Sequence, residues 1–164
     1  MNILLFGKTG QVGWELQRAL APLGNLIALD VHSTDYCGDF SNPEGVAETV
    51  RSIRPDIIVN AAAHTAVDKA ESEPKFAQLL NATSVEAIAK AANEVGAWVI
   101  HYSTDYVFPG NGDMPWLETD ATAPLNVYGE TKLAGEKALQ EHCAKHLIFR
   151  TSWVYAGKGN NFAK

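Results

Sequence analysis

The sequence contains few cysteines, and it has neither a long hydrophobic run nor an excess of basic residues. Its two cysteines, Cys37 and Cys143, can form at most one disulfide, and free thiols are the commoner state inside cells. No apolar stretch approaches the roughly 20 residues that a membrane-spanning helix needs. The first residues, Met1 to Gly7, lack the basic region of a signal peptide. We therefore expect a cytoplasmic protein without a membrane partner.

The charge balance is acidic. Asp and Glu number 19 against 13 Lys and Arg, which leaves a formal net charge of -6. Because binding along a nucleic acid needs clustered lysines and arginines to neutralise phosphates, we expect no nucleic-acid partner. The length of 164 residues and the hydrophobic fraction of 46% are those of one ordinary globular domain.

Short apolar runs alternate with segments of helical periodicity along the chain. The apolar runs predict strands over residues 3–6, 26–29, 56–59, 98–101 and 147–150, with a shorter extended piece near residues 36–40. The periodic segments predict helices over residues 12–20, 41–53, 73–94 and 128–142. This alternation is typical of βαβ units, so the predicted fold class is α/β, a Rossmann-type, doubly wound and mostly parallel sheet.

The first predicted strand leads into a GxxGxxG turn, formed by Gly7, Gly10 and Gly13, that opens a helix. Glycine permits a tight turn, close approach of a pyrophosphate to backbone N–H groups, and close packing of the helix on the sheet. An ordinary strand-to-helix turn is the alternative. A nucleoside-triphosphate loop is excluded, because it needs a glycine where Asn2 stands.

Asp30 follows the second predicted strand, where an acid can bind the adenosine ribose of a dinucleotide. Its negative charge should repel a 2′-phosphate, so we expect NADH to be accepted at least as well as NADPH.

Tyr128 and Lys132 lie four residues apart in a predicted helix, so their side chains share one face. We expect the lysine cation to lower the pKa of the phenol from its usual value of about 10, so that the phenol can exchange a proton with a substrate oxygen. Ser103 and Thr104 follow a predicted strand, and ligands bind at the carboxyl ends of parallel strands. Thr104 can then donate to a carbonyl oxygen. The alternative for Tyr128 and Lys132 is a pair on a solvated helix face. The alternative for Ser103 and Thr104 is that their hydroxyls only form hydrogen bonds with the backbone of a turn.

Four segments together resemble the extended short-chain dehydrogenase/reductase family: the glycine turn, residues 60–63 (NAAA), residues 103–108 (STDYVF), and residues 128–132 (YGETK). The resemblance implies NAD(P)H-dependent reduction of the C4 ketone of a dTDP-linked sugar. The product would serve the synthesis of cell-surface polysaccharide such as lipopolysaccharide O-antigen. Tyr128 would protonate O4 as hydride arrives at C4, and Thr104 would orient that oxygen.

The resemblance also implies the binding roles. The cofactor would be NADPH or NADH, with its pyrophosphate held by Gly7, Gly10, Gln11, Val12 and Gly13. Its remaining contacts would be Asp30 at the adenosine ribose, Asp39 and Phe40 at the adenine, Ala62, Ala63 and His64 along the strand, and Tyr128 and Lys132 at the nicotinamide ribose. The nucleotide-sugar substrate would contact Thr104, Asp105 and Trp153.

Members of the resembled family continue beyond the length of this chain. We therefore expect a fragment: residues 1–150 form the dinucleotide-binding domain, residues 151–164 begin a substrate-binding region, and the rest of that region is missing. The full-length protein is expected to be a homodimer. Glu15 resembles a residue that helps some members bind Mg²⁺ between subunits, although a solvated surface acid is the simpler interpretation. No metal-ligating residue is expected otherwise.

Other members of the fold remain alternatives. A dehydratase is disfavoured, because Tyr106 follows Asp105 where dehydratases usually have a glutamate. A sugar-nucleotide epimerase and a non-catalytic NADP-binding regulatory subunit stay open, although a pure binding module would not need Thr104, Tyr128 and Lys132 together. The spacing of His142 and His146 could suit zinc, but basic groups near a helix C-terminus have a simpler electrostatic reason to be there.

Overall fold

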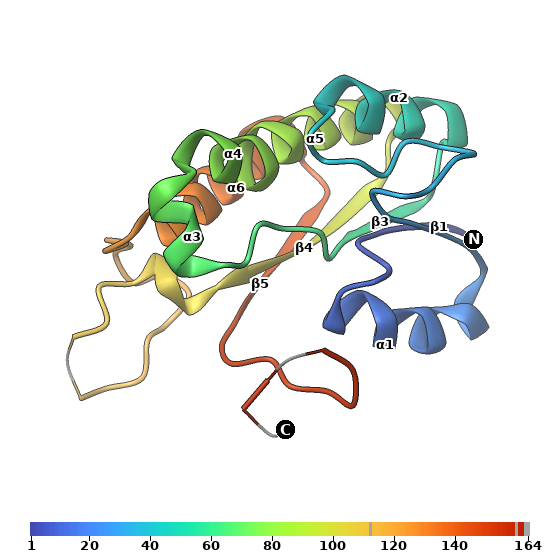
Figure 1. Cartoon of the computed structure of the whole chain (residues 1–164). Helices are drawn as coiled ribbons and strands as arrows, with labels where there is room; N and C mark the ends of the chain where they lie inside the picture. Colours follow the sequence, from blue (N-terminus) through green and yellow to red (C-terminus); the bar gives the residue numbers. More distant parts are fainter. Residues whose placement is uncertain (112, 160, 163–164) are drawn as a thin grey trace.

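The computed structural model describes residues 1–111, 113–159 and 161–162, and its centre is a parallel sheet (Figure 1). Within these residues the sheet has five strands in the order β2-β1-β3-β4-β5, and every neighbouring pair is parallel. The strands are β1 (Asn2–Phe6), β2 (Asn25–Leu29), β3 (Ile57–Asn60), β4 (Trp98–Thr104) and β5 (His146–Thr151). The predicted Rossmann-type α/β fold is confirmed.

Helices cover both faces of the sheet. The main helices are α1 (Gln11–Leu20), α2 (Pro43–Ile53), α3 (Val67–Ser72), α4 (Pro74–Gln78), α5 (Ser84–Val95) and α6 (Val127–His142). Figure 1 shows α1 on one side of the sheet, with α2, α5 and α6 on the other. Among the described residues no helix is both long enough and apolar enough to span a bilayer.

Each face of the sheet has its own hydrophobic core. The larger core, under α2, α5 and α6, includes Leu4 and Ile58 of the central strands. The smaller core includes Leu5 and Val59, which pack with Leu16 of α1. Alternate residues of one strand therefore point into different cores, which explains why these strands are continuously apolar in sequence.

The strand order reverses direction between β1 and β3. The chain leaves β1 for β2 on one side and returns to place β3 on the other side of β1. The loops at the carboxyl ends of these two strands therefore diverge, and in open α/β sheets such a point is where ligands bind. Gly7 follows β1 with a φ of +85°, and a Cβ there would lie 2.7 Å from the backbone of Ala61. Only glycine lets the two loops approach so closely.

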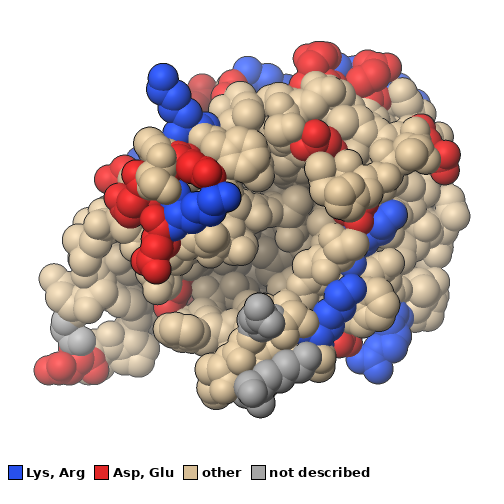
Figure 2. Space-filling view, viewed as in Figure 1, with Lys and Arg blue, Asp and Glu red and all other residues tan. Residues whose placement is uncertain are grey.

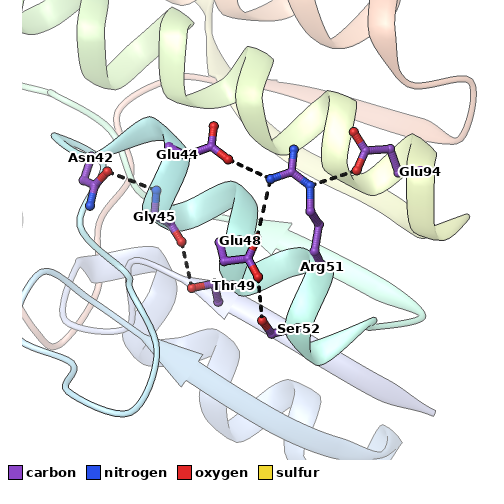
Figure 3. A network of polar contacts seen from close by, with 8 residues as sticks. All are labelled: Asn42, Glu44, Gly45, Glu48, Thr49, Arg51, Ser52 and Glu94. Atoms are coloured by element: carbon purple, nitrogen blue, oxygen red, sulfur yellow. Dashed lines mark hydrogen bonds and ion pairs between the residues drawn. The ribbon is translucent and has the colours of Figure 1, made fainter.

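Helix α2 begins with a side-chain cap. Asn42 caps the helix by accepting a hydrogen bond from the Gly45 N–H at 3.0 Å, and Pro43 occupies the first turn. Arg51 then joins α2 to α5, because its guanidinium contacts Glu44 and Glu94, each at 2.8 Å (Figure 3).

Three predicted elements differ from the structure. The extended piece near residues 36–40 forms no strand; Asp39 instead closes a turn by accepting from the N–H and hydroxyl of Ser41, and Phe40 packs on Phe6. The helix predicted over 73–94 begins one residue later, because Pro74 disfavours helical backbone at Glu73, and it contains a π-helical turn over Leu79–Thr83. Strand β4 extends to Thr104 instead of ending at residue 101.

Candidate functional site

A cavity of about 900 Å³ lies along the carboxyl ends of the strands. Its walls come from the loops after β1, β2, β3 and β4, from the start of α6, and from residues 151, 153–154 and 161–162. Figure 2 shows a hollow in this face, with visible walls that are mostly neither acidic nor basic. The cavity has a glycine-loop end, beside β1 and β2, and a reaction end, beside β4 and α6, where the chemically reactive side chains gather.

The glycine-loop end is built from backbone. Gly7, Gly10, Gln11 and Val12 line the cavity, and α1 begins at Gln11, so the N-terminus of a ten-residue helix lies at the wall. Exposed N–H groups and the helix dipole favour an anion such as a pyrophosphate at this position. Gly13 does not line the cavity; a Cβ there would lie 2.0 Å from the Gly7 carbonyl oxygen, so its role is to let α1 pack against the turn.

Asp30 lies at the wall of the cavity in a network that the sequence analysis did not foresee. Its Oδ1 accepts from the His32 N–H at 3.0 Å and from the Ser33 hydroxyl at 3.2 Å. Lys8 Nζ donates to the Ser33 hydroxyl at 3.2 Å and lies 3.9 Å from the Asp30 carboxylate. Burial alone would raise the pKa of Asp30, but the His32 N–H and the Lys8 charge lower it below its usual value.

This pairing changes the expectation about the cofactor. The charge of Asp30 was expected to repel a 2′-phosphate, but the Lys8 cation beside Asp30 compensates that charge. The spacing of Lys8 from Asp30 in sequence gives no signal of the contact, which exists only once β1 and β2 are neighbours.

Of the other residues assigned to the cofactor, most line the cavity and one does not. Asp39, Phe40, Ala62 and Ala63 line the cavity. His64 does not line it: its side chain is buried and meets the Phe76 ring edge-on. Its backbone is fixed instead by the amide of Asn81, which accepts from the His64 N–H at 2.8 Å and donates to the His64 carbonyl at 3.1 Å.

At the reaction end, Thr104, Asp105, Tyr128, Lys132 and Trp153 all line the cavity. The Thr104 hydroxyl donates to Asp105 Oδ1 at 3.2 Å and accepts from the Tyr106 N–H at 3.2 Å. Trp153 has a left-handed φ of 44°, which is unusual for a residue with a side chain, and its exposed ring lies at the rim.

The pKa of Tyr128 is raised above its usual value. Burial of the phenol is the main cause, and the negative charge of Asp105 adds to it, while a hydrogen bond with Thr104 acts in the opposite direction. The prediction that Lys132 lowers this pKa is therefore wrong for this structure, because burial and Asp105 outweigh the effects that favour phenolate.

Lys132 is buried, with 2% of its surface exposed. Its ammonium donates to the Tyr102 carbonyl oxygen at 2.7 Å and lies 3.4 Å from Nε2 of His101. Burial lowers the pKa of Lys132 to about 8, although the charge of Glu136 opposes this shift. The amine is thus held against β4 and can change its protonation state near neutral pH.

A buried ion pair that was not predicted from the sequence lies beneath the reaction end. Glu136 is 1% exposed, accepts from the Ser103 hydroxyl, and binds Arg150 Nη2 at 2.7 Å. The guanidinium also stacks over the Phe108 ring, 4.9 Å from its centroid. These contacts join β4, β5 and α6 below the cavity. An acid one helical turn after Lys132 is the signal that could have revealed the pair.

The residues considered for metals have ordinary partners. Glu15 pairs with Arg18 at 2.9 Å on α1. His142 Nε2 lies 3.6 Å from the carboxylate of Glu86, and His146 Nδ1 contacts the Cys143 carbonyl oxygen at 2.6 Å. Of the segment assigned to the substrate region, residues 160, 163 and 164 lie outside the described residues.

A parallel sheet with a glycine turn after β1, an acid after β2 and a cavity at the switch point defines a dinucleotide-binding domain of Rossmann type. The profile of the RmlD substrate binding domain family matches residues 1–164. The chain therefore belongs to this family, and the resemblance to extended short-chain dehydrogenases/reductases is confirmed.

Individual relatives are close in sequence and fold. The chain is 98% identical over 164 residues to a dTDP-4-dehydrorhamnose reductase of Escherichia coli (strain K12), with 100% of this chain and 55% of that protein covered. Crystal structures of dTDP-4-dehydrorhamnose reductases from Clostridium acetobutylicum and, in complex with NADP, from Bacillus anthracis each superpose with a TM-score of 0.92 at 39% identity. Each covers 99% of this chain and 57% of the solved chain. The chain thus spans about half the length of the relatives it matches.

Proposed function

We propose that this chain is the dinucleotide-binding part of an NAD(P)H-dependent reductase that converts the C4 ketone of dTDP-4-dehydro-L-rhamnose to the alcohol of dTDP-L-rhamnose. Residues 1–150 would bind the dinucleotide, and residues 151–164 would begin the sugar-binding region. The observation that carries the proposal is a single cavity with the glycine turn at one end and Thr104, Tyr128 and Lys132 at the other. The names of the relatives, one of which was crystallised in complex with NADP, support it.

The cavity fits a nicotinamide dinucleotide. Its volume of about 900 Å³ lies in the range of small-molecule and cofactor sites. Gly7 and Gly10 form a wall where no side chain intrudes, and the start of α1 supplies N–H groups for the pyrophosphate. Asp30 can accept from the hydroxyls of an adenosine ribose, and Lys8 beside it can receive a 2′-phosphate. Both NADH and NADPH are therefore expected to bind.

The bound dinucleotide would supply a hydride to C4 of the sugar. Tyr128 would supply the balancing proton to O4, so that the carbonyl becomes a hydroxyl. Its raised pKa suits this direction, because the phenol keeps its proton at neutral pH until negative charge develops on the oxygen. Thr104, which lines the same end of the cavity as Tyr128, would orient O4, and the Asp105 carboxylate at the same wall would bind the sugar.

Lys132 would hold the ribose next to the nicotinamide and face the proton donor from one helical turn away. Its amine is already fixed by the Tyr102 carbonyl at 2.7 Å, so little side-chain entropy is lost when a ligand binds. Trp153 at the rim would contact the nucleotide sugar.

The assay that tests this function uses a form of the chain extended to the length of its relatives. Incubated with NADPH and dTDP-4-dehydro-L-rhamnose, it should oxidise NADPH and form dTDP-L-rhamnose in equal amounts. A sugar-nucleotide epimerase would isomerise the sugar without net oxidation of NADPH. A regulatory subunit would bind NADP without turnover. Either outcome overturns the proposal, and a mixture without the sugar is the control.

Three further expectations belong to this proposal and follow from the family resemblance. The extended protein would be a cytoplasmic homodimer, it could hold Mg²⁺ near Glu15 at the subunit interface, and its product would enter cell-surface polysaccharide such as O-antigen. Light scattering of the extended protein with Mg²⁺ and with a chelator tests whether the protein is a homodimer and whether the dimer depends on Mg²⁺. A Glu15→Gln variant that dimerises and retains Mg²⁺ as the unmodified protein does would contradict the metal site.

A further inference from the structure

Two fully buried polar residues, Asn60 and His101, lie behind Lys132 and have no part in the proposed reaction. Their exposed fractions are 1% and 0%. Asn60 is the last residue of β3 and His101 lies opposite it in β4. Buried polar groups are costly unless they are hydrogen-bonded, so their arrangement at the back of the site calls for a reason.

The orientation of the Asn60 amide is determined by its neighbours. Its Oδ1 accepts from the Ala62 N–H at 3.0 Å, and a backbone N–H can only donate. The other amide atom, Nδ2, must therefore be the one that lies 3.0 Å from Nδ1 of His101. Since Nδ2 is a donor only, Nδ1 of His101 is the acceptor and carries no proton.

This arrangement determines the proton on the histidine ring. Complete burial lowers the pKa of His101 well below its usual value, so the ring is neutral and has one N–H. With Nδ1 accepting from Asn60, that proton is on Nε2. Nε2 lies 3.4 Å from Nζ of Lys132. An N–H that faces an ammonium finds no acceptor, whereas a neutral amine offers it a lone pair.

We propose that Asn60 and His101 are positioning residues for Lys132: Asn60 fixes the His101 tautomer with its proton on Nε2, and this N–H favours the uncharged amine of Lys132. The inference rests on the proposed function, in which Lys132 acts beside Tyr128. Its consequence there is an amine that can take up or release a proton near neutral pH while the Tyr102 carbonyl holds it in place.

Other groups around Lys132 act on the same proton. From α6, Glu136 favours the charged amine, and from β5 Arg150 neutralises Glu136 through a 2.7 Å ion pair. The remaining titratable groups at this end of the cavity are Tyr102 of β4, Asp105 after β4, Tyr106, and Tyr128 of α6. None of these is altered by a substitution at position 101, so a change in Lys132 after such a substitution reports on His101.

The test is nuclear magnetic resonance of the 164-residue chain. In the unmodified chain, the ring nitrogens of His101 should show the proton on Nε2, and the side-chain resonances of Lys132 should give its pKa. His101→Phe keeps a planar aromatic ring and removes both ring nitrogens; it should raise the pKa of Lys132 by about one unit. His101→Gln can keep an acceptor for Asn60 and a donor toward Lys132, so it should restore the low value.

Two further variants make the test decisive. Asn60→Asp presents acceptors only, so it should move the His101 proton to Nδ1 and leave Nε2 to accept from the ammonium. His142→Gln, at the far end of α6, should leave both the tautomer and Lys132 unchanged. Finding the proton on Nδ1 in the unmodified chain, or an unchanged Lys132 pKa in a folded His101→Phe chain, overturns the proposal. If His101→Phe does not fold, the tautomer of the unmodified chain and the Asn60→Asp variant decide.

The extended protein provides a separate readout. The limb of its kcat profile that follows Lys132 should move in His101→Phe by the shift measured for Lys132, with the KM for the sugar unchanged. A profile that does not move overturns the link to catalysis. If the unmodified extended protein does not oxidise NADPH at all, the proposed function fails, while the tautomer and the Lys132 titration still test the positioning.

Discussion

The two ends of the cavity are built by different means. At the glycine-loop end the wall is backbone, and the decisive feature is the absence of side chains at Gly7 and Gly10. At the reaction end the wall consists of ionisable side chains, among which Lys132 is almost fully buried. One end can bind through fixed N–H groups with little dependence on pH. Chemistry at the other end depends on the protonation states of these side chains. Those states are set by contacts with neighbours from several elements.

The first prediction separates chemistry from binding at the reaction end. In the extended protein, Tyr128→Phe removes the proposed proton donor and keeps the ring, so kcat should fall by about 10²- to 10⁴-fold. The dissociation constant for NADPH should change by less than about twofold, because the phenol adds at most one neutral hydrogen bond to cofactor binding. Stopped-flow kinetics and calorimetry measure the two quantities. Tyr36→Phe, outside the cavity, is the matched control, and activity retained in Tyr128→Phe contradicts the assignment.

The second prediction concerns the pH dependence of stability at the same end. The pKa of Lys132 is lowered from 10.5 to about 8 in the folded chain, so between these pH values the unfolded chain binds more protons than the folded one. The free energy of unfolding should therefore rise with pH across this window, by up to about 3 kcal/mol relative to Lys132→Met. Urea unfolding of both chains at several pH values checks this. Parallel curves for the two chains would show that Lys132 titrates normally.

The third prediction addresses the glycine-loop end. A Cβ at Gly13 would lie 2.0 Å from the Gly7 carbonyl oxygen, so Gly13→Ala must displace α1 from the turn. We expect a loss of about 1–3 kcal/mol of stability and at least about tenfold weaker dinucleotide binding, since about 1.4 kcal/mol corresponds to tenfold. Gly157→Ala is the control, because nothing lies within 4 Å of a Cβ there. Thermal unfolding and calorimetry with NADP measure both effects; equal affinities for the two variants would contradict the proposed pyrophosphate site.

The fourth prediction refines the account of cofactor choice. Lys8→Ala removes the cation beside Asp30, so binding of NADPH should weaken by about tenfold while binding of NADH changes little, as expected for one lost charge-assisted contact. Titration of the chain with each dinucleotide gives the ratio. Lys137→Ala, on the exposed face of α6, should leave it unchanged. An equal loss for both dinucleotides would mean that Lys8 acts through the fold of the loop.

Local features of the fold could be predicted from the sequence. The glycine turn and the Asn42 cap depend on residues within one short segment, so their patterns carry the information. The extended piece near Phe40 could not be judged correctly, because an apolar residue there satisfies its burial against Phe6 and not in a sheet. The π-helical turn over Leu79–Thr83 could not be predicted, because the helical pattern of the sequence continues through it.

Most of the residues that line the candidate site were predictable from the sequence, with Gly13 and His64 as exceptions, whereas its electrostatics were not. Tyr128 and Lys132 reach the same cavity because helical spacing is a local property. The contacts that set their pKa values cross between elements: His101 and Tyr102 come from β4, and Asp105 from the turn that follows it. Such long-range partners leave no pattern in one sequence, which is why the expected lowering of the Tyr128 pKa was wrong.

The central claim is that one dinucleotide reaches from the glycine turn to Tyr128 and gives its hydride to the sugar. The most direct measurement gives the extended protein NADPH with deuterium at the transferable position of the nicotinamide, together with dTDP-4-dehydro-L-rhamnose. Mass spectrometry and nuclear magnetic resonance of the product should place one deuterium on C4 of the rhamnose. A product without deuterium at C4, or NADPH left unoxidised, would contradict the account.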